Sequence, residues 1–321
     1  MLTTLPTFDR ELLELAPLTA RKNDLDINDI LPKNKSRSKT NSFQIVAEKI
    51  VKAKSQKSAV VLMMGAHVLR AGVQRYLIDM MEKGQISCIA LNGAGVIHDF
   101  EFALIGATTE SVAHYIKDGR FGFWQETSYI NDIVSSGAEK NKGLGEAVGQ
   151  VIEKECFPHR EISILAAGYR LNIPVTVHVG IGYDIVYQLP NCNGAAYGAA
   201  SYTDFLRYAC ILESLENGVV MNFGSAIMAP EVFLKGLSMA RNSARQKNKT
   251  ISRFTTLVCD LANLPENYRE EPARDNPLYY FRPWKTMLIR TVADGGESFY
   301  VRGDHSQTIP ELWSAIYDLD R

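Results

Sequence analysis

Short apolar runs alternate with amphipathic segments through most of the chain. Five runs are short, apolar and partly β-branched, as expected of strands buried on both faces: residues 59–64, 86–91, 175–179, 219–223 and 256–261. The segments between them have a helical spacing of apolar residues: 67–83, 110–117, 144–155, 161–172, 202–216 and 230–247. Such alternation predicts an α/β fold that is doubly wound around a largely parallel sheet.

The first part of the chain lacks this alternation. Residues 1–32 mix apolar and acidic side chains, and residues 32–43, PKNKSRSKTNSF, are rich in lysine and serine without periodicity. A stretch of that composition is typical of a solvated linker or arm. We therefore predict an N-terminal arm and linker over residues 1–43 and a single domain over residues 44–321.

Composition narrows the classes of function. With 321 residues, 46% of them hydrophobic, the chain can bury a large core, and its net charge of −1 disfavours nucleic-acid or anionic-membrane partners. The N-terminus lacks a signal-peptide pattern, and no apolar run reaches the roughly 18 residues of a membrane span. The five cysteines are scattered, which predicts reduced thiols in a cytoplasmic protein. No histidine pair has the spacing of a helical metal site, so no metal is predicted.

Glycines and small polar residues gather where the predicted strands end. Parallel sheets bind ligands outside the carboxyl ends of their strands, where bare backbone N–H groups suit phosphates. The residues concerned are Gly65, Ala66 and His67, then Gly93, Ala94 and Gly95, then Gly182, Gly224 and Asn263. None of these loops has the full G-x-G-x-x-G spacing or that of a P-loop. Their joint position predicts a bound dinucleotide, although glycine at such turns also serves packing alone.

One of these turns is followed at once by titratable side chains. In LNGAGVIHDFE, residues 91–101, the glycines precede His98, Asp99 and Glu101. An imidazole beside a carboxylate can move a proton near neutral pH, which makes His98 and Asp99 candidates for catalysis. The alternative is that each is a helix cap or a satisfied core residue. Asp184 and Glu231 lie in or just after two of the other strand-end loops.

Three stretches together resemble deoxyhypusine synthase and its relatives: GAHVLRAGVQRYLIDMM, LNGAGVIHDFE and DGRFGFWQET. The resemblance runs from about Gly65 to the end and is strongest over residues 65–127. It implies a Rossmann-like fold, NAD as cofactor, a homotetramer, and oxidation of spermidine. In that family the aminobutyl group is held as an imine on a lysine and passed to a lysine of a translation factor.

The resemblance assigns roles position by position. NAD-contacting positions match Ala66, His67 and Val68, then Gly93, Ala94 and Gly95, and finally Asp304 and His305. His98 and Asp99 fall where the family has an acidic pair at the polyamine site, so one carboxylate has become histidine. Asp184 matches one of two family aspartates in a glycine-rich turn, and Glu231 falls near a histidine beside the amine. Loss of one acid favours a smaller or less charged amine than spermidine.

The family's catalytic lysine has an imperfect counterpart. In YYFRPWKTM, Lys285 falls at the right place, with Trp284 adjacent rather than two residues before it. As a nucleophile its amine must be neutral, and Tyr280, Phe281 and Trp284 would have to lower its pKa by excluding water. The alternative is an ordinary lysine at a strand end.

We expect an NAD-dependent transferase that moves an aminoalkyl group from a polyamine to an acceptor amine through an imine on Lys285. His98 would move protons, while Asp99, Asp184 and Glu231 would hold the amine, with a protein lysine as one acceptor. A second hypothesis keeps NAD without transfer, as an amine or amino-acid oxidoreductase or cyclodeaminase. A third is a non-catalytic NAD-binding scaffold.

Overall fold

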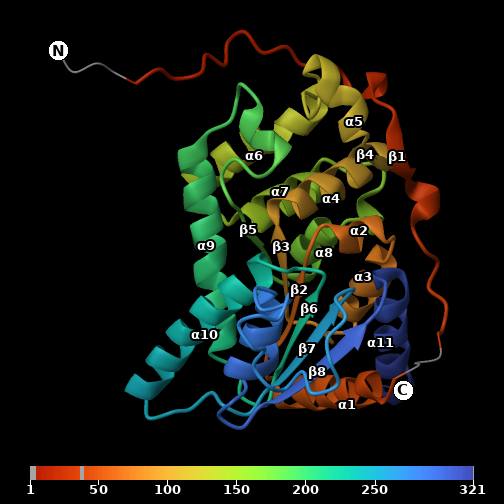
Figure 1. Ribbon diagram of the computed structural model, residues 1–321. Coiled ribbons are helices and arrows are strands. Elements are labelled where there is room, and N and C mark those ends of the chain that lie inside the picture. Colours follow the sequence, from red (N-terminus) through yellow and green to blue (C-terminus); the bar gives the residue numbers. More distant parts are fainter. Residues whose placement is uncertain (1–4, 37–39, 321) are drawn as a thin grey trace.

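The computed structural model describes residues 5–36 and 40–320 and has a six-stranded parallel sheet at its centre (Figure 1). The strands are β2 (Val60–Met64), β3 (Cys88–Asn92), β5 (Val175–His178), β6 (Val219–Phe223), β7 (Thr255–Asp260) and β8 (Glu297–Arg302). Their order is β5-β3-β2-β6-β7-β8, and every neighbouring pair is parallel. This is the strand order of the doubly wound Rossmann fold. The predicted fold class is confirmed, together with all five strands predicted from the apolar runs.

Helices cover both faces of the sheet. In Figure 1, α9 (Gly194–Leu212) and α10 (Met228–Gln246) lie to the left of the strands, whereas α3 (Gln74–Glu82) and α11 (His305–Leu319) lie to the right. Side chains of β2 alternate between the two layers: Leu62 and Met64 join the core beside α3 and α11, and Met63 joins the core beside α10. A strand buried on both faces reads as a continuous apolar run, which explains the pattern in its sequence.

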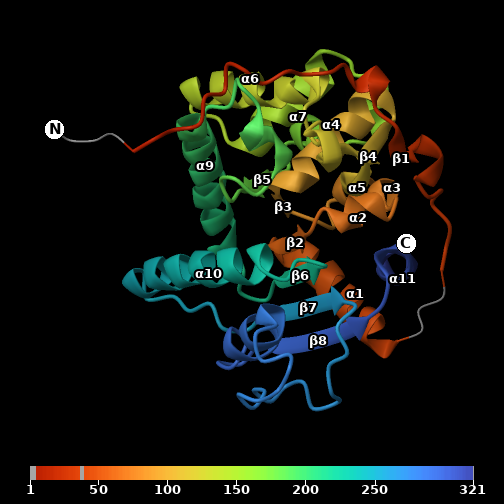
Figure 2. The ribbon, with the colours of Figure 1, turned by 45° about the horizontal axis from the view of Figure 1, so that its top comes forward.

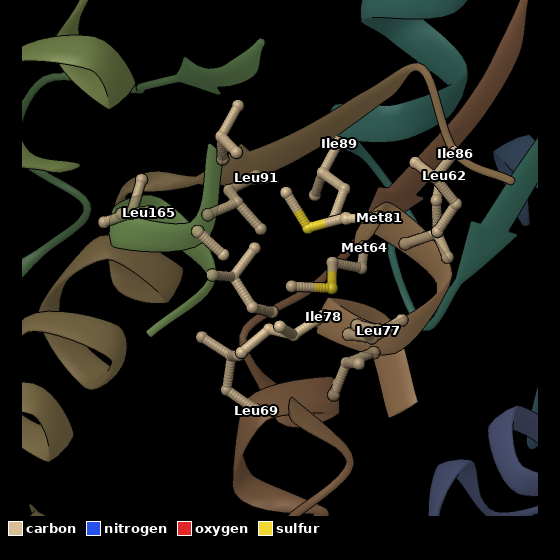
Figure 3. Close-up of a cluster of buried hydrophobic side chains, with 14 of the residues drawn as sticks. Leu62, Met64, Leu69, Leu77, Ile78, Met81, Ile86, Ile89, Leu91 and Leu165 are labelled. Carbon is tan, nitrogen blue, oxygen red and sulfur yellow. The ribbon is translucent and has the colours of Figure 1, made fainter. Parts of the chain in front are cut away.

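The core between β2, β3 and α3 is well packed (Figure 3). Leu62, Leu77 and Met64 are fully buried there, and Leu165 reaches the same cluster from α8 (Ile164–Leu171). Each such side chain contributes about 1.5–3 kcal/mol relative to remaining exposed. This core holds the carboxyl ends of β2 and β3 in fixed positions, which matters for the loops that follow them.

The N-terminal arm is bound along the molecule. Its strand β1 (Asn23–Asp26) pairs antiparallel with β4 (Ala107–Glu110), away from the main sheet (Figure 2). Residues 32–35 of the predicted linker are exposed, but this stretch is held to the domain, because Lys33 pairs with Asp79 at 2.5 Å and the Ser36 amide donates to Ser314. Residues 37–39 lie outside the described residues. We call residues 5–36 the N-terminal strap.

The helix predicted over residues 67–83 is two helices, α2 (His67–Arg70) and α3. Gly72 separates them with a φ of +73°, and a Cβ there would lie 2.1 Å from the carbonyl oxygen of Asp29. The break therefore lets the strap pass close to the turn. Periodicity alone did not reveal it, because apolar spacing continues across Gly72.

The glycines that follow β3 are not a turn. Helix α4 (Gly93–Ile105) begins at Gly93 itself, and the Asn92 side chain caps it by accepting from the Gly95 amide at 3.2 Å. His98, Asp99 and Glu101 therefore lie on one helix, where His98 and Glu101 both contact Thr108 and Asp99 points to another side. Because α4 begins at Gly93 rather than after the glycines, the side chains expected to form one polar cluster are distributed around a helix.

The remaining elements complete the two helical layers and their connections. They are η1 (Leu18–Ala20), η2 (Ile27–Asp29), α1 (Asn41–Gln56), α5 (Val112–Tyr115), η3 (Ile116–Asp118), α6 (Gln125–Glu139), α7 (Leu144–Lys154), η4 (Arg160–Ile162), η5 (Ile185–Gln188) and the π-helix η6 (Trp284–Arg290). Helix α9 begins eight residues before its predicted start, at Gly194, where Asn193 caps it. The glycine- and alanine-rich first turns of α9 carry little apolar periodicity.

Candidate functional site

The sheet has a topological switch point between β2 and β6. The chain leaves β2 toward β3 on one side, and it continues from β6 toward β7 on the other. Ligands of doubly wound folds bind in the crevice that forms where neighbouring loops diverge in this way. The loops here are Gly65–His67 after β2 and Gly224–Ser225 after β6, both of which the sequence singled out.

The two loops pack directly on each other. A Cβ at Gly65 would lie 2.5 Å from the carbonyl oxygen of Gly224, so Gly65 is required for the close approach of the two backbones. Gly224 has a φ of +63°, and the His305 ring lies against it. His305 is 9% exposed, and its Nδ1 has no hydrogen-bond partner among the described residues. A buried polar atom without a partner at a switch point is suited to a ligand.

Beside this crevice lies a cavity of about 270 Å³. It is formed by the first turns of α4, the last residue of α2, strand β4, the loop before η5 and the strap. Its hydrogen-bonding side chains are Arg21, Arg70, His98, Glu101, Thr109, Glu110, Tyr183 and Asp184. We call it the α4 cavity. It brings together Ala94, His98 and Asp184 from the predicted site.

Three buried polar atoms of the α4 cavity have no partner among the described residues: Arg70 Nε, Thr109 Oγ1 and Glu110 Oε2. Burying such a group unpaired costs about 1–3 kcal/mol. Thr109 also has a φ of +70°, a region that costs a residue with a branched side chain additional energy. Strain and unpaired atoms in one cavity indicate a binding site, since a ligand would supply the missing partners.

Both signs of charge line the cavity. Burial raises the pKa of Glu110, although Trp124 Nε1 donates to its Oε1 at 2.9 Å. Burial also raises the pKa of Asp184 to about 6 and lowers the pKa of His98 to about 4, so His98 is a neutral imidazole near neutral pH. The Arg70 guanidinium supplies positive charge in the same cavity.

Helix α2 connects the cavity with the switch crevice. It begins at His67, directly after the β2 loop, and ends at Arg70 in the cavity wall. Arg70 Nη1 lies 3.2 Å from His67 Nε2, and because a guanidinium only donates, that imidazole nitrogen accepts. A ligand in the crevice and one in the cavity would therefore contact opposite ends of a single helical turn.

The amino end of α4 does not provide the predicted phosphate cradle. The Asp184 carboxylate covers it, accepts a hydrogen bond from the Ala94 amide, and would lie 2.2 Å from a Cβ at Gly93. A carboxylate already satisfies the positive end of this helix and would repel a phosphate. The structure thus removes Gly93, Ala94 and Gly95 from the residues suited to hold cofactor phosphates.

Asp99 lies on the other side of α4. It is 1% exposed and accepts from Ser163 Oγ at 2.5 Å and from the amides of Ile164 and Leu165, at the start of α8. Burial raises the pKa of this carboxyl to about 6. Asp99 joins two helices and does not line the α4 cavity, contrary to its predicted role in holding the amine.

Replacing Asp99 with Ala should therefore lower stability without altering ligand binding. We expect a loss of about 1–3 kcal/mol in the free energy of unfolding, because the amides of Ile164 and Leu165 lose their acceptor. Urea denaturation measures the loss, and ligand titration of the folded variant supplies the control. A weakened ligand affinity at unchanged stability would restore Asp99 to the site.

Other predicted site residues are placed outside the cavity. Glu231 is paired with Arg282 at 2.6 Å and with Lys235. Asn263 Oδ1 accepts from Arg302 at 3.4 Å. Gly182 has a φ of +89° in an open loop, Val68 is fully buried in the core, and Asp304 caps α11.

Lys285 is buried but not in the α4 cavity. It lies in the π-helix η6 rather than at a strand end, is 5% exposed, and holds its Nζ 3.5 Å from the centroid of the Tyr279 ring. Of the aromatic residues expected to exclude water, Tyr280 is 83% exposed and Trp284 donates to the Tyr268 carbonyl instead. Tyr279, which the sequence analysis did not choose, is the ring that faces the amine.

A larger hollow, of about 470 Å³, lies at the amino end of β5 beside Asp204 and Arg207. Asp204 there accepts from the amides of Gly145 and Val177, and no side chain lining the hollow has an unpartnered buried atom among the described residues. We therefore assign the site to the smaller α4 cavity.

Among residues 5–36 and 40–320, no group of three or more histidine, cysteine, aspartate or glutamate side chains is arranged to hold a metal ion. Within the same residues, no helix is both long and apolar enough to cross a bilayer. The five cysteines are free thiols.

Sequence reasoning missed Arg21, Arg70 and Glu110. Arg21 and Glu110 are brought to the cavity by the pairing of β1 with β4, whose sequences NDLD and ATTE are too short and polar to be recognised as strands. The position of Arg70 in the sequence was a weak indication of its role, because it lies one helical turn after the loop that follows β2.

A family model of the C-terminal Rossmann-fold domain of ArgZ-like arginine dihydrolases matches residues 44–177, which is less than half of the chain. No curated protein matches the sequence.

Several solved structures share the fold at low sequence identity. Apo ArgZ, an arginine dihydrolase of the cyanobacterial ornithine-ammonia cycle, is 16% identical with a TM-score of 0.52, over 87% of this chain and 33% of that one. AgrE in its ternary complex with ornithine and NAD⁺ is 14% identical with a TM-score of 0.50, over 87% and 33%. An LOR/SDH-type protein from Methanococcus maripaludis S2 is 15% identical with a TM-score of 0.52, over 90% and 73%.

These comparisons bear on the expected family. The chain spans about a third of the length of ArgZ and AgrE. A deoxyhypusine synthase-like protein from Entamoeba histolytica is 10% identical over 96% of this chain and 98% of that one, with a TM-score of only 0.41, too low to support an argument. The Rossmann fold that the resemblance implied is confirmed, whereas membership of the deoxyhypusine synthase family stays a prediction.

Proposed function

We propose that the chain is an NAD-dependent enzyme that oxidises the amino-bearing carbon of an amino acid or a closely related zwitterionic amine. The observation that carries this proposal is the α4 cavity, which is lined by Arg70 and Glu110, each with a buried polar atom that has no partner among the described residues. The likeness in fold to AgrE, solved with ornithine and NAD⁺, supports both the cofactor and the substrate class.

The switch crevice would hold NAD. The Gly65 and Gly224 amides already donate to the carbonyls of Phe223 and Cys259, so a pyrophosphate here would use the first amides of α2, which have no side-chain cap. His67 and His305 supply imidazole groups on the two sides of the crevice, and the free Nδ1 of His305 suits a ribose or amide group. When bound there, NAD supplies a hydride acceptor.

The cavity would bind a zwitterion through opposite ends. Arg70 offers a donor to a carboxylate, and a guanidinium forms its strongest hydrogen bonds with carboxylates. Glu110 and Asp184 offer acceptors to an ammonium group, and a bound cation would favour their ionised forms against the burial that raises their pKa values. A single ammonium group needs fewer acids than a polyamine does.

His98 would take a proton from the substrate ammonium. The neutral imidazole has one lone pair to offer, and the cavity places it beside the acids that would hold the ammonium. Loss of the N–H proton frees the nitrogen lone pair to form a C=N bond as the carbon-bound hydrogen leaves with its electron pair. The fate of the resulting imine decides between net oxidation and cyclodeamination.

The proposal leaves out the aminoalkyl transfer first expected. A lysine imine would require the Lys285 amine in the substrate cavity, whereas Lys285 lies over Tyr279 in η6. Spermidine as substrate, a protein-lysine acceptor, a homotetramer and a cytoplasmic location stay predictions of the sequence analysis.

Substituting Lys285 with Met should leave amino-acid oxidation at the wild-type level. Methionine keeps the length and burial of the side chain while removing the amine, and no step proposed here uses that amine. Borohydride treatment during turnover should trap no substrate on the protein. Trapping on Lys285, together with loss of turnover in the Met variant, would favour the transferase instead.

The proposed function is tested by replacing Arg70 with Met. With NAD⁺ and ornithine as the first probe, we expect KM for the amino acid to rise roughly 10- to 100-fold, because a charge-assisted hydrogen bond to the carboxylate contributes about 1.5–3 kcal/mol. Fluorescence of reduced nicotinamide follows the reaction. A panel of other amino acids covers the case in which ornithine is not the preferred substrate.

The matched control is Arg75→Met. Arg75 lies on α3 close to Arg70 in sequence but does not line the cavity, and its one described hydrogen bond, to the Ile30 carbonyl, is long at 3.5 Å. This variant should keep the wild-type KM. Equal effects of the two substitutions, or no amino-acid-dependent reduction by the wild-type protein with any of the panel, would refute the proposal.

A further inference from the structure

His98 lies at one end of a buried chain of hydrogen bonds. Its Nδ1 is 2.9 Å from Thr108 Oγ1, and the Thr108 hydroxyl is 2.6 Å from Glu101 Oε2. Thr108 is 0% exposed and Glu101 is 1% exposed, so water does not compete for these contacts. The chain links β4 with two successive turns of α4.

Glu101 can only accept in this arrangement. Arg21 donates to both of its oxygens at 2.8 Å, and Thr127 Oγ1 donates to Oε1 at 2.7 Å. A carboxylate held by a bidentate guanidinium is ionised and carries no proton to give. The hydroxyl proton of Thr108 must therefore point toward Glu101.

This direction determines which proton His98 carries. With its only proton donated to Glu101, the Thr108 oxygen can only accept from the imidazole, so Nδ1 must bear the hydrogen. We infer that Thr108 and Glu101 are positioning residues that hold His98 as the Nδ1–H tautomer, with the lone pair on Nε2 free for the substrate. This inference rests on the proposed function for the role of that lone pair.

The N-terminal strap anchors the chain of hydrogen bonds. Arg21 stands just before β1, and both side chains of its ion pair with Glu101 are 1% exposed. Without Arg21, the buried Glu101 carboxylate would lose its cationic partner and the two hydrogen bonds that hold it as an acceptor for Thr108.

Burial keeps the ring neutral. Burial is the largest influence on the pKa of His98; Glu101 opposes it, whereas Arg70, Arg21 and His67 reinforce it. A neutral ring has a single N–H, so the position of that hydrogen is a question of tautomer alone.

Nitrogen-15 NMR of the imidazoles tests the inference directly. In the wild-type protein, with NAD⁺ and without substrate, the His98 resonances should be those of a neutral ring protonated at Nδ1; loss of these signals in His98→Gln assigns them. Thr108→Val should abolish this preference and yield a mixture or the Nε2–H form, and Thr108→Ser should restore it.

Thr127→Val is the matched control. It removes another threonine hydroxyl from Glu101 but leaves the contact between Thr108 and His98, so the tautomer should remain Nδ1–H. An Nε2–H ring in the wild-type protein, or an unchanged tautomer in Thr108→Val, would overturn the inference.

The NMR result does not depend on turnover. An Nδ1–H ring in a protein that oxidises no amino acid would refute the proposed function and leave the assigned tautomer standing. If the function holds, Thr108→Val should also lower kcat about tenfold or more with little change in KM. A change in KM at an unchanged kcat would contradict the positioning role.

Discussion

Replacing His98 with Gln is expected to lower kcat by about 10²- to 10⁴-fold, the usual contribution of a positioned proton acceptor. Glutamine fills a similar space and can reach Thr108, but its amide cannot take a proton from an ammonium group. Because Arg70, Glu110 and Asp184 remain in place, KM for the amino acid should change little. Steady-state kinetics with NAD⁺ separates the two parameters.

His114→Gln provides the control for His98→Gln. His114 is an exposed histidine on α5 whose ring packs edge-on against Tyr115, and it does not line the α4 cavity. It should keep full activity. A His98→Gln variant with kcat within about threefold of wild type would exclude His98 as the proton acceptor.

Arg21→Met is expected to lower the free energy of unfolding by about 3–5 kcal/mol, the range found when one partner of a buried ion pair is removed. Arg21 donates to both oxygens of Glu101, and neither side chain is more than 1% exposed. The substitution leaves the buried Glu101 carboxylate without its cationic partner. Urea denaturation followed by circular dichroism measures the change at a constant m-value.

A double variant distinguishes this cause from simple loss of packing. The double variant Arg21→Met, Glu101→Gln also removes the buried carboxylate charge. It should therefore recover a large part of the stability that Arg21→Met loses. Arg120→Met, which breaks the exposed surface pair of Arg120 with Asp118, should change stability little. An Arg21→Met protein as stable as wild type would show that the strap does not anchor this site.

The central sheet was predictable because its strands are buried on both faces. Each of the five apolar runs in the sequence became a strand, and the loops at Gly65 and Gly224 were recognised as strand-end loops suited to a ligand. Burial of a whole strand leaves a local signal, since every residue in the run must be apolar.

The cavity was only partly predictable, because its walls come from distant segments. Arg21 and Glu101 are 80 residues apart and meet through the short polar strands β1 and β4. Asp99 and His98 are neighbours in sequence but point to opposite sides of α4, so an apparent pair separates into a helix cap and a cavity residue. The two side chains separate because α4 already begins at Gly93. The sequence did not reveal this start, because the glycines there indicated a turn.

The central claim is that one zwitterion bridges Arg70 and Glu110 beside a cofactor in the switch crevice. A crystal structure of the protein with NAD⁺ and an amino acid from the panel tests it most directly. We expect the carboxylate on Arg70, the amino group near Glu110 and His98 Nε2, and the pyrophosphate between the Gly65 and Gly224 loops. An amino acid bound beside Lys285, or an empty α4 cavity at saturating ligand, would contradict the account.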